Sequence, residues 1–248
     1  MRPQRPETIV APDADALAQR AAERITARFR AARGRIAFCL TGGSSPERLY
    51  ELLAGKPYRG SLPWDRIHIF LGDDRYVPYD DPLSNFGMAR RLLLDHVPLP
   101  PGNIHPIPTG AGNVAEDALR YQTELRGFYG AQQLDPKRPL FDVVLMGVGD
   151  DGHTASLFPG RSELDETQRW VVGVPQAGMA PLVPRITLTF PALASTRDML
   201  FLVNGRGKRE IVARILSGAD LPAARARSQG DLVWLLDRDA QPEQRDVA

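Results

Sequence analysis

The residues best suited to chemistry lie in one glycine-rich segment, Gly147-Val148-Gly149-Asp150-Asp151-Gly152-His153. Histidine is the side chain whose ordinary pKa best suits general base work near neutral pH. A lone histidine in a loop is more often structural or solvated than catalytic. A histidine beside aspartates, in a turn shaped by glycines, favours a catalytic role for His153.

The same segment also has the G-x-G-x-x-G spacing that is typical of dinucleotide-binding turns. Two carboxylates inside the loop would repel a pyrophosphate. The next predicted strand, at residues 170–174, ends without the acidic residue that binds a ribose. We therefore reject the dinucleotide interpretation.

A second polar group, Asp73-Asp74-Arg75, directly follows the apolar run at residues 67–71. Its carboxylates could orient a water or a hydroxyl group. Its arginine could hold a substrate oxygen or stabilise negative charge that develops in a transition state. The alternative is that these residues pair with each other or cap a helix. The three residues alone leave both interpretations open.

A third segment, residues 41–46, joins a predicted strand to a predicted helix. Gly42 and Gly43 allow a close backbone approach, Ser44 and Ser45 offer hydroxyls and a cap, and Pro46 suits a first helical turn. Because a helix N-terminus attracts anions, this segment could cradle a phosphate. A tight turn with a serine cap is the alternative.

Two basic residues lie at further junctions of the predicted elements. Arg185 precedes the strand at 186–190, and Lys208 opens the helix at 207–217. A positive side chain at a helix N-terminus opposes the helix dipole, so a bound anion would explain Lys208. A solvated lysine is the alternative. The chain has four histidines and one cysteine, Cys39, and no second histidine at ligand spacing, so a metal site is not expected.

The elements that must position these residues alternate along the chain. Short apolar runs bounded by turn residues predict strands at 36–40, 67–71, 141–147, 170–174, 186–190, 199–203 and 232–237. Apolar residues at helical spacing predict helices at 13–33, 46–54, 85–97, 114–129 and 207–217. This alternation predicts an α/β fold, a Rossmann-like, doubly wound, mostly parallel sheet with helices on both faces. Ligands of such sheets bind at the carboxyl ends of the strands, where the polar segments lie.

The composition of the chain restricts which partners and which cellular location we expect. The 248 residues include 31 basic and 30 acidic side chains, which gives no electrostatic signature of nucleic-acid binding. No apolar run reaches membrane-spanning length and no secretory signal is evident, so we expect a cytoplasmic protein with no membrane partner. We expect one domain over residues 1–248, with a loose C-terminal tail from about residue 242.

Taken together and in order, these motifs resemble the 6-phosphogluconolactonase family. The resemblance runs from residue 40 to about residue 216 and rests on residues 41–46, 73–75 with 77–78, 84–85, 147–159, 184–189 and 205–208. It implies one Rossmann-like domain, shared with glucosamine-6-phosphate deaminases and isomerases, and no metal or organic cofactor. It also implies hydrolysis of 6-phosphogluconolactone to 6-phosphogluconate in the oxidative pentose phosphate pathway, so the expected partner is a small phosphorylated sugar lactone.

The resemblance also implies roles for particular residues. His153 is the expected general base, with Asp151 positioning the imidazole or the sugar. Arg75 is the expected partner of substrate oxygens, supported by Asp73. The expected phosphate-binding residues are Gly42, Gly43, Ser44, Arg185 and Lys208.

The chain departs from the family pattern at two positions. Asp74 stands where a glutamate usually precedes the arginine, which puts the reach of that carboxylate in question. Leu83 stands where an aspartate usually precedes Ser84-Asn85, a pair that we expect to cap a helix.

Two other functions compete with lactone hydrolysis. The deaminase relatives carry a glutamate five residues after the loop histidine, where this chain has Phe158, so an acid used in ring opening is missing. A non-catalytic sugar-phosphate sensor would keep the pocket without the chemistry, but the presence of Asp73, Arg75, Asp151 and His153 argues against it. We expect a monomer or a weak homodimer.

Overall fold

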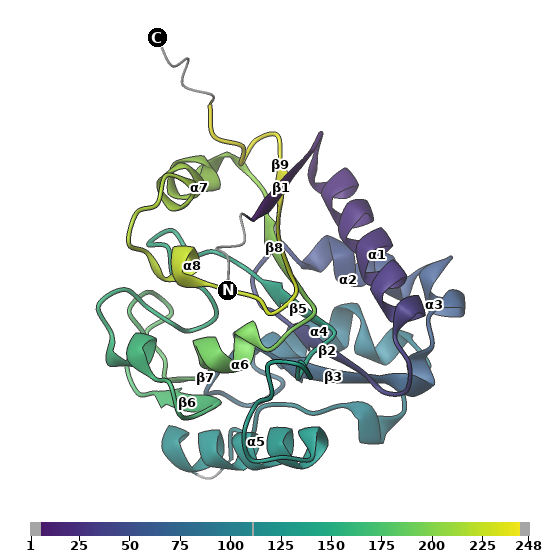
Figure 1. Ribbon diagram of the computed structural model, residues 1–248, viewed down its shortest axis with the longest axis vertical. Coiled ribbons are helices and arrows are strands. Elements are labelled where there is room, and N and C mark those ends of the chain that lie inside the picture. Colours follow the sequence, from purple (N-terminus) through teal and green to yellow (C-terminus); the bar gives the residue numbers. More distant parts are fainter. Residues whose placement is uncertain (1–5, 111, 244–248) are drawn as a thin grey trace.

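The computed structural model describes residues 6–110 and 112–243, and its centre is a parallel six-stranded sheet (Figure 1). The strands, in spatial order, are β1 (Glu7–Ala11), β9 (Asp231–Asp237), β8 (Asp198–Val203), β5 (Val143–Met146), β2 (Ile36–Leu40) and β3 (Ile67–Leu71). Strands β2, β5 and β8 are buried along their whole length, as expected for parallel strands covered on both faces. The predicted parallel α/β fold is confirmed.

Helices lie on both sides of this sheet, with α1 and α2 to its right and α7 and α8 to its left in Figure 1. The longer helices are α1 (Ala14–Ala31), α2 (Glu47–Ala54), α4 (Asn85–Leu92), α5 (Val114–Tyr129) and α7 (Arg209–Leu216), and the short ones are α3 (Tyr58–Ser61), α6 (Phe190–Ala194) and α8 (Pro222–Arg225). Helix α1 begins after Asp13, whose carboxylate accepts a hydrogen bond from the Ala16 N–H. Its buried stripe includes Leu17, Ile25 and Phe29, at the spacing that predicted it.

A second sheet differs from the sequence-based expectation. It has three antiparallel strands in the order β4 (Asp73–Arg75), β7 (Arg185–Leu188) and β6 (Val171–Val174). The runs at 170–174 and 186–190 were expected in the parallel sheet, and residues 73–75 in a loop. The register sets Asp73 opposite Thr187 and Arg75 opposite Arg185, so this small sheet brings together polar residues distant in sequence.

Several boundaries also differ from prediction. Strand β1 was not predicted. The strand predicted to end at Phe190 stops at Leu188, and Phe190 begins α6. The helix predicted at 207–217 is a 3-10 turn, Arg206–Lys208, followed by α7. Of the predicted tail from residue 242, residues 244–248 lie outside the described residues.

The strand order reverses at β2, because the chain passes from β2 to β3 on one side and later enters β5 on the other. Such a reversal opens a crevice at the carboxyl ends of the strands. A buried tyrosine anchors the end of β2: the Tyr50 hydroxyl donates to the Thr41 carbonyl at 2.7 Å and accepts from the Thr41 N–H at 3.1 Å. Tyr121 makes the same pair of bonds to Leu71 at the end of β3.

Among the residues that the structure describes, no helix has both the length and the apolar character needed to cross a membrane.

Candidate active site

A cavity of about 240 Å³ opens at the carboxyl ends of β2 and β5, at the reversal of strand order. Five separate segments of the chain contribute to its wall. The predicted site residues that line it are Gly42, Gly43, Ser44, Asp73, Arg75, His153, Arg185 and Lys208. Asp151 lies behind this wall, in contact with His153. The residues singled out in the sequence therefore meet at one place.

The His153 imidazole faces the cavity and is held from behind by Asp151. The distance from His153 Nδ1 to Asp151 Oδ1 is 2.6 Å, and the same oxygen accepts the His153 backbone N–H at 3.0 Å. A neutral ring that donates from Nδ1 carries its lone pair on Nε2. Within residues 6–110 and 112–243, no hydrogen-bond partner occupies that nitrogen. The arrangement suits a general base.

The backbone around His153 is shaped to receive its ring. A Cβ at Gly149 would lie 2.0 Å from two imidazole atoms, so only glycine fits there. The Gly149 N–H donates to the His153 carbonyl at 2.9 Å and closes the turn. The ring of Phe158 packs against the imidazole, with 4.6 Å between ring centroids. The imidazole is thus fixed by Asp151 and Phe158.

Asp73 is buried at the back of the cavity, and its main partner was not predicted. The Ser156 hydroxyl donates to Asp73 Oδ2 at 2.6 Å, and both residues are at most 5% exposed. Ser156 follows His153 by three residues in the same loop. Its closeness to His153 in the sequence is the only signal that could have pointed to Ser156.

Asp74 lies outside the cavity and caps α4. Its carboxylate accepts backbone N–H bonds from Arg75, Asn85 and Phe86 at 2.7–3.0 Å. Burial nevertheless raises its pKa to about 6. Ser84 is the N-cap of the helix, as predicted, with its hydroxyl accepting the Gly87 N–H at 3.0 Å. The aspartate that replaces the usual glutamate thus bonds to the helix N-terminus.

Arg75 is held in place by Asn85, for which the sequence predicts only a part in the helix cap. The Asn85 side-chain oxygen accepts from Arg75 Nη1, and the Leu83 carbonyl accepts from the same nitrogen at 3.1 Å. A Cβ at Gly42 would lie 1.9 Å from that Asn85 oxygen. Gly42 therefore makes room for Asn85, as well as lining the cavity.

The turn after β2 presents its backbone to the cavity. Gly43 has a φ of +87°, a left-handed conformation that favours glycine, and Ser44 follows it in the cavity wall. The predicted serine cap is wrong: the N-cap of α2 is Pro46, with no side-chain hydrogen bond, because the Glu47 N–H donates to the Ser44 carbonyl instead. The Ser44 and Ser45 side chains are therefore not used as caps.

Two cations complete the site. Arg185 is 4% exposed, and its Nη2 donates to the Pro181 carbonyl at 2.9 Å. Burial lowers the pKa of its guanidinium. Lys208 Nζ lies 2.5 Å from Oδ1 of Asp150, a partner not predicted from the sequence. Because the Asp150 side chain is 70% exposed, a ligand anion could replace it on Lys208.

Chemically, the cavity combines one base, a buried carboxylate and three cationic side chains. The base is His153, and the cations are Arg75, Arg185 and Lys208. This set fits an anionic substrate that undergoes attack by water or loss of a proton. Among the described residues, no group of three or more histidine, cysteine or acidic side chains is arranged to hold a metal ion.

Comparison with known proteins identifies the family. The family model for glucosamine-6-phosphate isomerases/6-phosphogluconolactonase matches residues 12–234. The 6-phosphogluconolactonase of Synechocystis sp. is 42% identical over 231 residues, which cover 90% of this chain and 92% of that protein. The crystal structure of 6-phosphogluconolactonase from Thermotoga maritima has a TM-score of 0.81 at 31% identity, over 94% of this chain and 100% of that chain.

The fold alone does not separate the two branches of this family. The structure of a monomeric glucosamine-6-phosphate deaminase has a TM-score of 0.78 over 94% of this chain and 98% of its own, at 22% identity. That likeness shows a shared fold only. With the family model spanning most of its length, the chain belongs to the family of glucosamine-6-phosphate isomerases and 6-phosphogluconolactonases.

Proposed function

We propose that this chain hydrolyses 6-phosphogluconolactone to 6-phosphogluconate, as an enzyme of the oxidative pentose phosphate pathway. Curated relatives named 6-phosphogluconolactonase, about 40% identical over most of the chain, favour the lactonase branch. The observation that carries the proposal is the His153–Asp151 pair at 2.6 Å, set in a cavity with three cationic side chains.

In the proposed first step, His153 Nε2 takes a proton from a water molecule as the water oxygen attacks the lactone carbonyl carbon. Asp151 stabilises the imidazolium that forms, because its carboxylate contacts Nδ1. The carbonyl oxygen becomes an oxyanion. Arg75, the cation already held by Asn85, is the proposed partner for that charge.

In the second step, the tetrahedral intermediate collapses and the bond from the carbonyl carbon to the ring oxygen breaks. The ring oxygen takes the proton back from His153 and becomes a hydroxyl group. The product is a carboxylic acid, which ionises near neutral pH. The base is thereby restored, so no proton donor beyond water and His153 is needed.

The phosphate of the substrate is assigned to the opposite part of the cavity. Lys208 and Arg185 supply positive charge, and the turn at Gly43 and Ser44 supplies backbone at the start of α2. Because the phosphate does not react, binding it serves to orient the lactone against His153.

Phe158 argues against deaminase chemistry. It lies where the deaminase relatives carry a glutamate, and its ring packs on the His153 imidazole. Sugar-ring opening would need an acid there. A phenyl ring can only position and desolvate the base. We therefore propose lactone hydrolysis rather than deamination.

The test follows acid release from freshly prepared 6-phosphogluconolactone, with ammonia release from glucosamine 6-phosphate measured in parallel. We expect acid release well above the uncatalysed rate and no ammonia. Lys208→Ala should raise KM more than it lowers kcat, because Lys208 is assigned to the phosphate. Acid release at the uncatalysed rate, with glucosamine 6-phosphate consumed, would overturn the proposal.

A further inference from the structure

A second cavity lies at the opposite end of the parallel sheet from the candidate active site. Its volume is about 560 Å³, and its wall includes Ala37, near the start of β2, and Asp142, just before β5. The active-site cavity begins beyond the other end of β2, at Thr41. We call this second cavity the arginine pocket, because five arginines line it: Arg28, Arg33, Arg35, Arg138 and Arg197.

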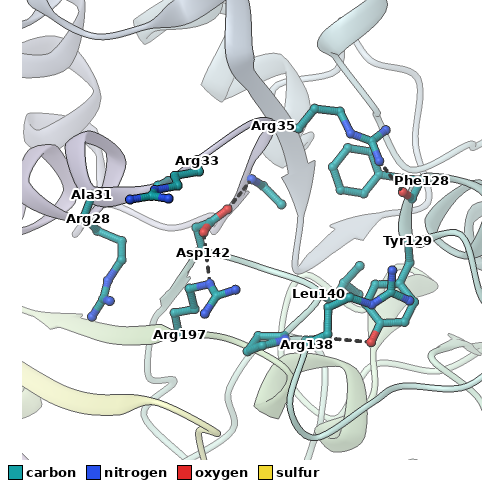
Figure 2. Close-up of a pocket in the computed structure, with 13 residues that line it drawn as sticks. Arg28, Ala31, Arg33, Arg35, Phe128, Tyr129, Arg138, Leu140, Asp142 and Arg197 are labelled. Atoms are coloured by element: carbon teal, nitrogen blue, oxygen red, sulfur yellow. Dashed lines mark hydrogen bonds and ion pairs between the residues drawn. The ribbon is translucent and has the colours of Figure 1, made fainter.

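Figure 2 shows how these side chains are arranged. Arg28, Arg33 and Arg197 lie around Asp142, whereas Arg35 and Arg138 lie beside Phe128 and Tyr129. Asp142 is the only carboxylate in this lining. The chain as a whole has 31 basic and 30 acidic side chains, so this concentration of positive charge is local.

The single carboxylate is already occupied. Asp142 Oδ2 accepts the Ala37 N–H at 2.9 Å, and Asp142 Oδ1 lies 3.4 Å from Arg197 Nε. Arg28 has a counter-ion outside the pocket, with its Nη2 at 3.2 Å from Asp231. Two of the five arginines are therefore compensated.

The other three arginines have no such compensation. Within residues 6–110 and 112–243, no carboxylate oxygen lies within 4.0 Å of Arg33, Arg35 or Arg138. Three guanidinium groups thus border one concave space without a counter-ion, so an anion that entered would meet three free positive charges.

Two of these arginines are held in position. The Arg35 guanidinium lies 4.4 Å from the centroid of the Phe128 ring, and its Nη2 donates to the Phe128 carbonyl at 3.0 Å. The Arg138 guanidinium lies 3.9 Å from the centroid of the Tyr129 ring. Stacking on an aromatic ring restricts an arginine that would otherwise be mobile in solvent. Groups ordered in advance lose less entropy when a ligand binds.

We propose that the arginine pocket binds a small molecule with a diphosphate group. One guanidinium group can donate two parallel hydrogen bonds to two oxygens of a phosphate. Several guanidinium groups together match an anion that carries several charges. The volume lies within the usual range for small-molecule sites. Because guanidinium groups already cover one face of Phe128 and of Tyr129, recognition falls to the phosphates rather than to ring stacking.

The test titrates isotope-labelled, full-length protein with inorganic pyrophosphate and follows backbone amides by NMR. The amides of Ala37 and Leu140 report on the arginine pocket, and those of Gly43 and Gly149 report on the active site. This separates the two cavities even if both bind the probe. We expect saturable shifts at Ala37 and Leu140.

Variants with matched charge changes distinguish a site from general attraction. Arg33→Gln/Arg138→Gln should weaken pyrophosphate binding at the Ala37 amide about tenfold, because charged hydrogen bonds are lost. Arg59→Gln/Arg214→Gln removes two exposed arginines that also have no carboxylate partner among the described residues, but lie outside the pocket, and should change binding less than about twofold. Arg33 makes no hydrogen bond or ring contact in the described chain, so Arg33→Gln alone should not disturb the fold. This single variant should still weaken pyrophosphate binding. It therefore tests the site even if the double variant misfolds.

ADP, as a second probe, distinguishes the source of the diphosphate. Affinity equal to that of pyrophosphate at the same amides supports recognition of the diphosphate alone, and higher affinity supports a nucleotide. Shifts that do not saturate, or equal weakening by both double variants, would overturn the proposal. So would binding of a single-stranded RNA oligonucleotide at these amides without saturable binding of pyrophosphate.

Discussion

At the scale of single residues, the site depends on contacts that hold a few side chains in place. Asp151 and Phe158 fix the His153 ring, and Asn85 fixes Arg75. Lys208 is different, because its partner Asp150 is a largely exposed carboxylate, and in the proposed function a substrate phosphate displaces it. In that proposal, Asp150 competes with the substrate phosphate for Lys208.

Removing that competitor should tighten substrate binding. We expect Asp150→Asn to lower KM for the lactone about two- to fivefold at unchanged kcat, since exposed ion pairs contribute about 0.2–1 kcal/mol. Asp165→Asn, which removes an exposed carboxylate outside the cavity, is the matched control and should leave KM unchanged. A higher KM in Asp150→Asn would show that Asp150 positions Lys208 rather than competing for it.

At the scale of elements, the parallel strands and most helices could be predicted, because their apolar residues recur with the right period. Strand β1 is the exception among the parallel strands and could not be predicted. Four of its five residues are not buried, and backbone pairing with β9 defines it. Strand β4 is a polar tripeptide whose partner β7 lies over a hundred residues away. Asn85 could be recognised as part of a helix start but not as the partner of Arg75, because that contact forms only when β4 and the start of α4 pack together.

Tyr50 links α2 to the end of β2, next to the turn assigned to phosphate binding. Tyr50→Phe leaves the buried N–H and carbonyl of Thr41 without their partner, which should lower the free energy of unfolding by about 1–3 kcal/mol in urea. It should also raise KM. Tyr58→Phe removes only the partly buried hydrogen bond that the Gln19 side chain donates to the Tyr58 hydroxyl. It should lower the free energy of unfolding by less than about 0.5 kcal/mol. Equal stability of the two variants would contradict this role.

A pair of histidines makes stability depend on pH. His68 Nδ1 lies 3.0 Å from His105 Nε2, and His105 Nδ1 lies 2.6 Å from Glu124. Burial, and then the charges of His105 and Arg35, lower the pKa of His68 from 6.5 to about 4.

Because His68 stays neutral in the folded state while the unfolded chain takes up a proton, its contribution to stability is present above pH 6.5. It is lost as the pH falls from 6.5 towards 4. We expect His68→Asn to lose less stability than the wild type between pH 7 and about pH 5, measured by urea unfolding. His96→Asn, at an exposed position, is the control. An equal loss of stability with falling pH in the wild type and in His68→Asn would contradict the lowered pKa of His68.

At the scale of the whole molecule, the two ends of one parallel sheet carry two cavities. The active-site cavity lies at the carboxyl ends of β2 and β5, and the arginine pocket lies at their amino ends. The first location follows from strand order, which the sequence could suggest. The position of the arginine pocket could not be predicted, because its arginines come from three segments that are distant in sequence and look there like solvated charges.

We expect a monomer or a weak homodimer. In the described part of the chain, the large apolar side chains that are exposed are Val10, Leu119, Leu182 and Leu216, which lie far apart in sequence and on different elements or loops. Stable interfaces usually need a contiguous apolar patch. We expect light scattering during size-exclusion chromatography to give a mass near 27.4 kDa. Twice that mass at all concentrations would contradict a monomer or weak dimer.

Turnover of 6-phosphogluconolactone by His153→Ala tests most directly whether His153 acts as a general base in lactone hydrolysis. We expect kcat to fall about 10²- to 10⁴-fold, while the inhibition constant of 6-phosphogluconate changes little, because the phosphate-binding side chains remain. A folded His153→Ala protein with near wild-type kcat would contradict the account.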